Sequence, residues 1–232
     1  TIASMKWNNI FFSTLFRKIL AAVSGLFLVT FLIGHLVGNL QLVIFTGEIA
    51  QQKFNAYALF MTTNPAVKIL SYVTYLSIIL HTILTIGLAI QSRKARPIPY
   101  AVSSGNKNSS WASKNMALLG TLILLFIIIH LRSFWYEMHF GSIPIDSWGN
   151  KDLYTVTVSA FHELWYTIFY VISMLILGIH LRHGIESGFQ TLGLKNKKFT
   201  PLIQTISLIL SALISLSFAI IPIILYIKSW IF

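Results

Sequence analysis

Five long apolar stretches constrain the fold of this 232-residue chain more than any other feature of its sequence. A helix rises about 1.5 Å per residue and the hydrocarbon core of a bilayer is about 30 Å thick, so about 20 apolar residues span it. Backbone groups inside lipid must pair within their own segment, and the alternating pattern of a membrane barrel is absent, which predicts helices. The apolar stretches cover residues 19–45, 69–91, 115–131, 164–181 and 202–227, the fourth with an amphipathic lead-in. We therefore expect an all-α integral membrane bundle, one domain over residues 1–232, with helices at about 17–45, 66–91, 114–138, 155–185 and 200–228.

Composition supports a membrane protein. Hydrophobic residues make up 56% of the chain and charged residues 10%, whereas a soluble domain needs more charge to cover its surface. The first apolar stretch follows Arg17 and Lys18 and is longer than the apolar region of about 7–15 residues in a signal peptide, so we expect a retained helix. The chain has no cysteine, which excludes disulfides, thiolate zinc sites and iron–sulfur clusters held by this chain.

The distribution of lysine and arginine predicts the orientation. If the N-terminus is cytoplasmic, twelve of the 17 bases fall on the inner side, and the positive-inside rule then places the C-terminus outside. The inner bases would be Lys6, Arg17, Lys18, Arg93, Lys94, Arg96, Lys107, Lys114, Arg182, Lys195, Lys197 and Lys198, and the outer bases Lys53, Lys68, Arg132, Lys151 and Lys228. They lie in short loops rather than on a basic helix face, so membrane lipid is expected as a partner and nucleic acid is not. The polar inner loop over residues 92–113 either docks a soluble partner or is a solvated link.

Four histidines interrupt the apolar stretches. His35, His81, His130 and His180 lie one on each of the first four predicted helices, and an ionisable residue inside a membrane indicates function. Counted from the bases at the inner ends, His35 and His130 lie roughly 27 and 24 Å deep. His81 lies roughly 18 Å deep by the same count, and His180 is close to Arg182 at the inner end. The odd helices therefore carry an outer pair and the even helices an inner pair.

Two histidines at like depth on different helices are suited to ligate one planar haem iron between them. A single membrane histidine more often makes a hydrogen bond between helices, but four at paired depths favour ligands. A copper or zinc site would gather its ligands at one depth, and a proton path would use aspartate or glutamate at mid-membrane, so both are disfavoured. Small residues near the histidines are expected to make room for haem faces: Gly34, Gly38, Ser77, Gly87 and Gly178.

Further polar residues flank the predicted haem sites. His183 shares a helical face with His180 and is an alternative ligand, although its place beyond Arg182 favours His180. Arg93, Arg182 and His183 are candidate contacts for haem propionates. For Arg132 and Arg182, snorkelling to the interface is favoured over a propionate contact. His139 and His162 fall at the outer interface, where they would bond a propionate, contact a quinone or face water.

At this point the residues resemble a known family. The segments are SGLFLVTFLIGHLVGNLQ around His35, FNAYALFMTTNP after the first helix, and LGIHLRHGIESGFQTLGLKNKKFTPLI around His180. They are similar to the dihaem cytochrome b membrane-anchor subunit, of the b558 type, of bacterial succinate:menaquinone oxidoreductases and fumarate reductases (respiratory complex II). The resemblance covers nearly the whole chain, and the last segment is the most specific.

The resemblance implies a mechanism and partners. A flavoprotein subunit with FAD and an iron–sulfur subunit would bind on the cytoplasmic side of the bacterial inner membrane and carry out the dicarboxylate chemistry. Electrons from succinate would enter an inner haem b held by His81 and His180. They would continue to an outer haem b held by His35 and His130, near which menaquinone would be reduced. The chain would thus act as the electron-transfer membrane subunit of a succinate dehydrogenase.

The quinone site departs from the family pattern. Some fumarate-reducing relatives use a glutamate in the first outer loop and another two residues before the fourth ligand. Here the latter position is Gly178, the loop stretch FNAYA has no acid, and Glu48 lies too early to match. This departure favours succinate oxidation over fumarate reduction. Candidate quinone-site residues on the outer side are Glu48, Asn55, Arg132, His139, His162 and Glu163, of which Glu163 is equally suited to a helix N-terminus.

Two alternatives remain open at this level. The first is the dihaem cytochrome b of another respiratory dehydrogenase, such as a formate dehydrogenase or a hydrogenase, which a copurifying FAD subunit with succinate-to-quinone activity would exclude. The second is a small transporter without a cofactor, which a b-type α band would exclude.

Overall fold

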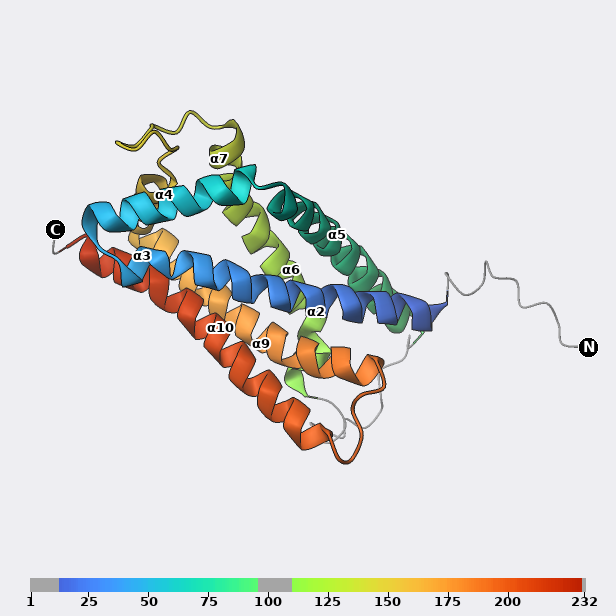
Figure 1. The fold of residues 1–232 in the computed structure, drawn as a ribbon. Helices are drawn as coiled ribbons and strands as arrows, with labels where there is room; N and C mark the ends of the chain where they lie inside the picture. Colours follow the sequence, from blue (N-terminus) through green and yellow to red (C-terminus); the bar gives the residue numbers. More distant parts are fainter. Residues whose placement is uncertain (1–12, 96–109, 231–232) are drawn as a thin grey trace, which may run out of the picture.

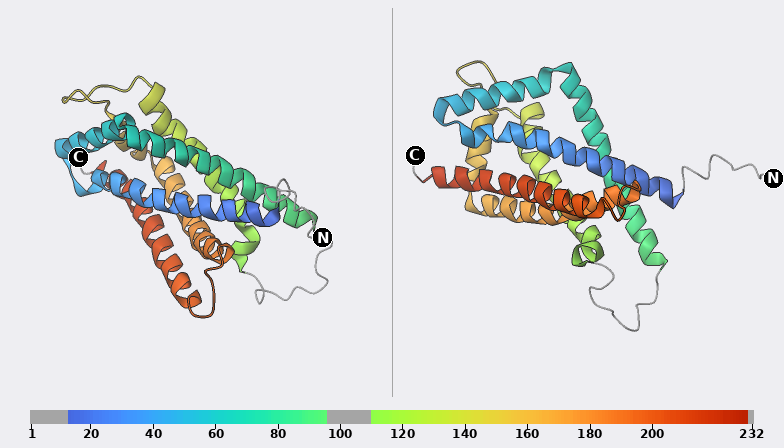
Figure 2. Two further views of the ribbon diagram at one scale, coloured as in Figure 1. Left: turned by 45° about the vertical axis from the view of Figure 1, so that its right-hand side comes forward. Right: turned by 60° about the horizontal axis from the view of Figure 1, so that its bottom comes forward.

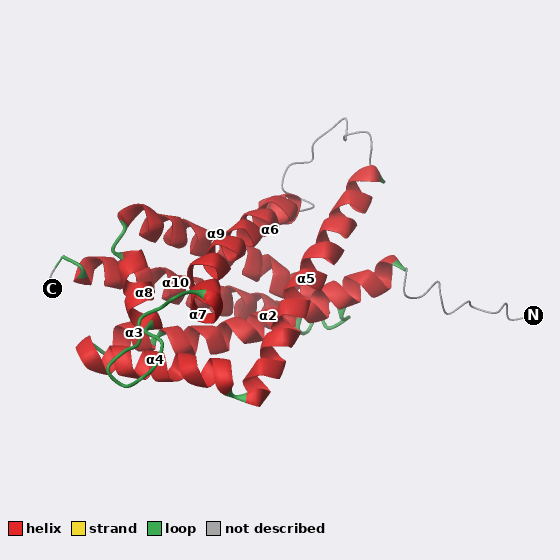
Figure 3. Ribbon diagram, turned by 90° about the horizontal axis from the view of Figure 1, so that it is seen from above, coloured by secondary structure: helices red, strands yellow, loops and turns green. Residues whose placement is uncertain are grey.

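The computed structural model describes residues 13–95 and 110–230, and this part of the chain is predominantly helical (Figures 1 and 3). Within it no strand forms, apart from an isolated bridge between Ile145 and Lys151. The helices in chain order are α2 (Thr14–Asn39), α3 (Gln41–Ile44), α4 (Gly47–Thr63), α5 (Pro65–Lys94), α6 (Trp111–His130), the π-helix η2 (Leu131–Trp135), α7 (Tyr136–Phe140), α8 (Leu153–Phe161), α9 (Leu164–Thr191) and α10 (Thr200–Lys228).

Five helical segments are long and apolar enough to cross a membrane. They are Thr14–Ile44, Pro65–Lys94, Trp111–Phe140, Leu164–Thr191 and Thr200–Lys228, which confirms the predicted all-α class and the number of spans. Figure 1 shows that α2 begins and α10 ends at opposite ends of the bundle. We call the end with Arg17 and Arg93 the inner end and the end with α4 and α8 the outer end.

Local sequence signals set where the spans begin. The Ser13 hydroxyl accepts a hydrogen bond from the amide of Phe16, and the Ser110 hydroxyl caps α6 in the same way at Ser113. Asn64 caps α5, and Pro65 follows at the first helical position, where its missing amide proton costs nothing. At the inner end, the Arg17 guanidinium donates to the side chain of Gln91, which joins the start of α2 to the end of α5.

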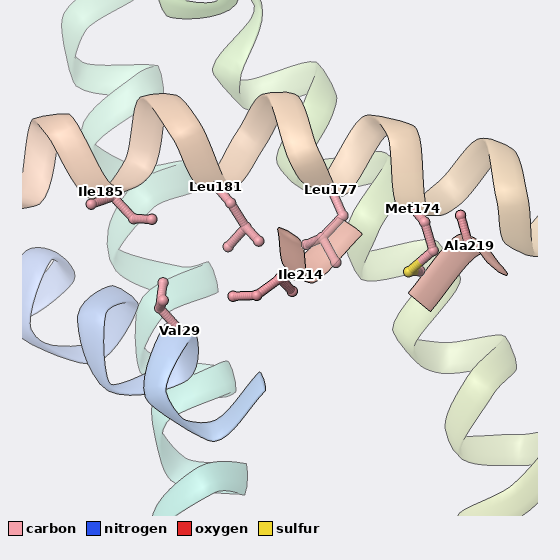
Figure 4. Close-up of a cluster of buried hydrophobic side chains, with 7 residues drawn as sticks. All are labelled: Val29, Met174, Leu177, Leu181, Ile185, Ile214 and Ala219. Carbon is pink, nitrogen blue, oxygen red and sulfur yellow. The ribbon is translucent and has the colours of Figure 1, made fainter. Parts of the chain in front are cut away.

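The helices pack around α9. It lies beside α10 along most of its length and also contacts α2 and α6, while α2 packs against α5 (Figures 1 and 2). One buried apolar core joins α2, α9 and α10, and Figure 4 shows its members: Val29, Met174, Leu177, Leu181, Ile185, Ile214 and Ala219. A second core lies nearer the outer end: Leu42, Phe54, Phe161, Tyr166, Tyr170, Ile221 and Leu225. By contrast, Thr74 is the single buried residue of α5 and Leu119 that of α6, so these two helices direct most of their apolar surface outward.

Three of the spans are less regular than the sequence predicts. The helix expected over residues 155–185 is two helices, because α8 ends at Phe161 and α9 starts at Leu164. The Thr167 hydroxyl donates to the Phe161 carbonyl across this break and satisfies a carbonyl that a continuous helix would have paired. The first span turns at Leu40, where the side chain of Asn39 donates to the His35 carbonyl. The third span contains the π-helix η2 directly after His130.

The region between the first two spans was expected to be a loop, but it is the 17-residue helix α4. Gly47 at its start has a φ of +57°, a left-handed conformation that glycine adopts without strain and that reverses the chain after α3. Figure 1 shows α4 at the outer end, near α7 and α8. These helices and the segment 141–152 form what we call the outer cap.

A buried amide holds the outer cap together. Asn55 of α4 is fully buried, and its side-chain nitrogen donates to Asp146 and Asp152, each at 2.9 Å. Its side-chain oxygen accepts from the backbone amide of Tyr154 at 2.8 Å. Gln51, one turn earlier, donates to the other oxygen of Asp152 at 2.8 Å. These bonds join α4, the segment 141–152 and α8 into one unit.

Candidate haem-binding site

The structure brings the two outer histidines into contact. The ring centroids of His35 on α2 and His130 on α6 lie 5.8 Å apart, with the ring planes at 89°. Metal–imidazole bonds are about 2.0–2.1 Å long, so a separation of this size is compatible with both imidazoles holding one metal ion. Both residues are of intermediate exposure in the chain.

Aromatic residues surround the outer pair. His35 stacks on Phe31 with centroids 5.5 Å apart, and Phe218 of α10 lies 5.7 Å from it. His130 lies between Phe126 and Phe134, one turn before and one turn after it on the same helical run. An apolar wall of this kind suits the face of a porphyrin and keeps water from the ring nitrogens.

The outer histidines have polar partners as well. The Nδ1 atom of His130 lies 3.1 Å from the Tyr170 hydroxyl, which accepts a hydrogen bond from the Tyr166 hydroxyl at 3.1 Å. Both tyrosines are 6% exposed. The Nε2 atom of His35 lies 3.5 Å from the side-chain nitrogen of Asn39, a long contact compared with the 2.8 Å bond from that amide to the His35 carbonyl.

The inner histidines lie against glycines of neighbouring helices. The Nδ1 atom of His81 on α5 is 3.0 Å from the Ala21 carbonyl of α2, and a Cβ added at Gly25 would lie 2.9 Å from His81 Cε1. On α9, His180 lies beside Gly120 of α6, where an added Cβ would be 3.6 Å from His180 Cε1. Both inner histidines therefore contact the odd spans, His81 through α2 and His180 through α6.

The two pairs lie at different levels along the bundle. Gly25 precedes His35 by ten residues on α2, and Gly120 precedes His130 by ten residues on α6. Ten residues of helix span about 15 Å, so the histidines that touch these glycines lie about that far toward the inner end. The first and third spans therefore carry the outer histidines. The inner histidines, on the second and fourth spans, contact glycines of the first and third spans.

The donor set fits two haem irons. A carbonyl oxygen accepts hydrogen bonds only, so the bond to Ala21 places the proton of His81 on Nδ1 and leaves the Nε2 lone pair free to ligate. The Nδ1 atom of His180 is buried without a hydrogen-bond partner in the described part of the chain. Within residues 13–95 and 110–230, no group of three or more His, Cys, Asp or Glu side chains is placed to hold a metal ion.

Two of the small residues near the histidines accommodate neighbouring helices. Gly178 accommodates α10, because an added Cβ would lie 2.7 Å from the Ser215 hydroxyl, and Gly38 accommodates the ring of Tyr57 from α4. Gly87 has open space around it and lies about 120° around α5 from His81. Gly34 also has nothing within 4 Å of an added Cβ.

Sequence reasoning missed Gly25 and Gly120, which do accommodate inner histidines. Each of these glycines lies ten residues before the outer histidine of its own span. This shared spacing is the sequence signal that would have found them.

The candidate propionate contacts gather at the inner end. Arg182 and Lys195 both pair with Glu186, at 3.9 and 3.5 Å, which connects α9 to the turn before α10. His183 is near His180, and its Nε2 atom pairs with the Ser187 hydroxyl at 3.1 Å. Arg93 lies in the exposed last turn of α5.

The six quinone-site candidates are spread over the outer end. Asn55 is the buried centre of the outer cap, and each polar atom of its side chain is already bonded there. Glu48 is exposed in the first turn of α4, His162 is exposed where α8 ends, and the exposed Glu163 precedes α9 without a side-chain capping bond.

Arg132 and His139 lie on the third span beyond His130. Arg132 pairs with Glu137 and lies over the Tyr136 ring. The His139 ring stacks on Trp135 with centroids 4.5 Å apart, and Trp135 donates to the Tyr75 hydroxyl of α5 at 2.7 Å. Tyr75, Trp135 and Glu137 are polar neighbours of these candidates that sequence reasoning missed.

Comparisons of the chain with protein-family models, with curated proteins and with solved structures find no match.

Proposed function

We propose that this chain is the dihaem cytochrome b membrane-anchor subunit of a bacterial succinate dehydrogenase that reduces menaquinone. The observation that carries the proposal is the contact between His35 and His130, 5.8 Å apart between two membrane helices and walled by aromatic rings. The second histidine pair, nearer the inner end, supports the proposal. Ionisable side chains inside a membrane are costly and indicate function, and here two separate pairs of imidazoles lie within the spans. The sequence segments around His35 and His180 add the resemblance to complex II.

The four histidines have assigned roles in this proposal. His35 and His130 would hold the outer haem b, and His81 and His180 the inner haem b. When bound, the two haems would supply one-electron transfer between the iron–sulfur subunit and menaquinone. The protein's part is to supply neutral imidazoles, to fix their tautomers and to exclude water from the iron ligands. His81 with Ala21 and His130 with Tyr170 have the polar partners that such a role requires.

The two ends of the bundle suit different partners. We place the flavoprotein and iron–sulfur subunits at the inner end, which we take as cytoplasmic, because most lysines and arginines lie there. Five of the six acidic residues lie at the outer end, and Glu186 is the exception. Menaquinone would bind near the outer haem, where His139 and Arg132 are candidate contacts. Asn55 is buried and both polar atoms of its side chain are already hydrogen-bonded, so it is better explained as a positioning residue of the outer cap.

The test is the haem content of the purified complex. We expect a reduced-minus-oxidised spectrum with a b-type α band, two haems per chain by pyridine haemochrome, and a copurifying flavoprotein with succinate-to-quinone activity. Replacing His35 or His130 by leucine removes the outer haem while the inner one persists, and replacing His81 or His180 does the reverse. Gln52→Leu, at an exposed position of α4 with no assigned role, is the control and keeps both haems.

Several outcomes would contradict the proposal. An assembled but colourless chain would exclude a cytochrome and favour a transporter. Loss of the same haem in the His35 and His81 variants would contradict the pairing. Copurification with a formate dehydrogenase or hydrogenase subunit would assign the chain to another respiratory complex. A complex that reduces fumarate with quinol faster than it oxidises succinate with quinone would reverse the proposed direction of electron transfer.

A further inference from the structure

The contacts of His81 lead beyond the identity of the ligands, and the inference from them rests on the proposed function. We propose that Ala21, Ser24 and Gly25 of α2 form a socket that sets both the tautomer and the position of the inner ligand His81. The helix that carries an outer ligand, His35, would thereby also position an inner one. We call these three residues the α2 socket.

The polar half of the socket fixes the proton. The Ala21 carbonyl lies 3.0 Å from His81 Nδ1, and the Ser24 hydroxyl oxygen lies 3.3 Å from the same atom. Ser24 donates its own proton to the Leu20 carbonyl at 2.8 Å, so toward His81 it has only lone pairs to offer. Both partners therefore accept, and the proton of His81 must lie on Nδ1.

The apolar half of the socket fixes the distance. An added Cβ at Gly25 would lie 2.9 Å from His81 Cε1 and 3.2 Å from Nδ1, and real Cβ atoms essentially never approach another heavy atom as closely as the first of these distances. The His81 ring therefore packs directly against the backbone of α2 at Gly25. Gly25 is also one turn after Ala21, so the residue that admits the ring lies beside the carbonyl that orients it.

This placement has a chemical consequence for the ligand. A histidine that donates its Nδ1 proton to an oxygen acceptor holds its Nε2 lone pair toward the metal and becomes a more basic ligand. His180, the partner of His81, has no such acceptor in the described part of the chain, and its glycine, Gly120, leaves an added Cβ at 3.6 Å, an ordinary contact. The two ligands of the inner site are therefore unequal, and α2 controls the constrained one.

The experiment compares three alanine substitutions in the full complex. Gly25→Ala displaces the His81 ring and breaks its bond to Ala21. We expect the affinity of the inner site for haem to fall about tenfold or more, the usual cost of disturbing the group that orients a ligand. Gly120→Ala is expected to have a smaller effect. Gly87→Ala, which adds the same methyl group to α5 where nothing lies within 4 Å, is the matched control and leaves both haems unchanged.

The readouts separate positioning from general damage. The haem-to-protein ratio, the low-temperature α bands and the EPR signals of the two low-spin haems are measured on the same preparation, and the outer haem reports that the bundle is assembled. An inner haem that is lost or altered in Gly25→Ala beside an unchanged outer haem supports the socket. An unaltered inner haem in that variant overturns it, and so does equal loss of both haems. A wild-type complex without any haem instead overturns the proposed function itself.

Discussion

The partner of one ring nitrogen decides what the other nitrogen of a histidine can do. At His81 that partner is a backbone carbonyl, which only accepts, so the ring is committed to one tautomer before any metal binds. At His130 it is the Tyr170 hydroxyl, which can accept or donate. At the outer site, a side-chain substitution can therefore change the basicity of the His130 imidazole without displacing its ring.

Tyr170→Phe tests this difference at the outer pair. The variant keeps the buried ring but leaves His130 Nδ1 without its hydroxyl, and an unpaired buried polar atom costs about 1–3 kcal/mol. If His130 holds iron through Nε2, as proposed, Tyr170 accepts the Nδ1 proton, and an imidazole that loses this acceptor would be a weaker donor to oxidised iron. We expect the midpoint potential of the outer haem to rise in a redox titration while that of the inner haem stays constant.

Tyr166→Phe is the matched control for that titration. It removes a hydroxyl from the same buried cluster but keeps the contact between Tyr170 and His130. An outer potential that falls in Tyr170→Phe, or that shifts equally in both variants, would contradict a direct effect through His130.

At the scale of the elements, the sequence predicted the spans and missed their ends. Apolar length is a property of many residues together, so five spans could be counted and their number proved correct. The breaks depend on single polar contacts with other parts of the chain. The hydroxyl of Thr167 reaches back over the break between α8 and α9, and the helix α4 is held by bonds from Asn55 to residues about 90 to 100 positions away. No local pattern contains such information.

The outer cap should depend on pH because two carboxylates hold it. Burial alone would raise the pKa of Asp152, but hydrogen bonds from Thr155, Asn55 and Gln51 outweigh it and hold that pKa below its usual value. The pKa of Asp146 is likewise lowered, because bonds from Asn150, Asn55 and Trp148 outweigh its burial. A depressed pKa means that both groups stabilise the cap above the unfolded value of about 3.9, and that this stability is lost as the pH falls through the lower, folded pKa.

Hydrogen exchange between pH 7 and pH 3 measures this, after correction for the intrinsic exchange rate. Amides over residues 144–155 are expected to keep their protection down to about pH 4 and to lose it below. The middle of α10, which contains no acid, is the internal control and stays protected throughout. Equal protection of residues 144–155 at both ends of the range would show that the carboxylates do not hold the cap.

At the scale of the whole molecule, the candidate site was more predictable than the surroundings of its residues. Depth along a helix follows from counting, so His35 and His130 could be assigned to one level and His81 to another from loop charge alone. The azimuth of a residue around its helix requires the neighbouring helices. That is why Gly178 was assigned to a haem face although it packs against Ser215, and why Gly25 was overlooked.

Orientation is the remaining property of the whole chain, and its lack of cysteine makes a clean test available. Most bases lie at the inner end, so the turn between α9 and α10 should face the cytoplasm and the outer cap the opposite side. Ser147→Cys and Lys197→Cys each place one thiol at an exposed position, in the cap and in that turn respectively. In intact spheroplasts a membrane-impermeant maleimide is expected to label the Ser147→Cys chain, and to label the Lys197→Cys chain only after permeabilisation. The reverse pattern would place Lys195, Lys197 and Lys198 outside, and would contradict our proposal that soluble subunits bind the inner end from the cytoplasm.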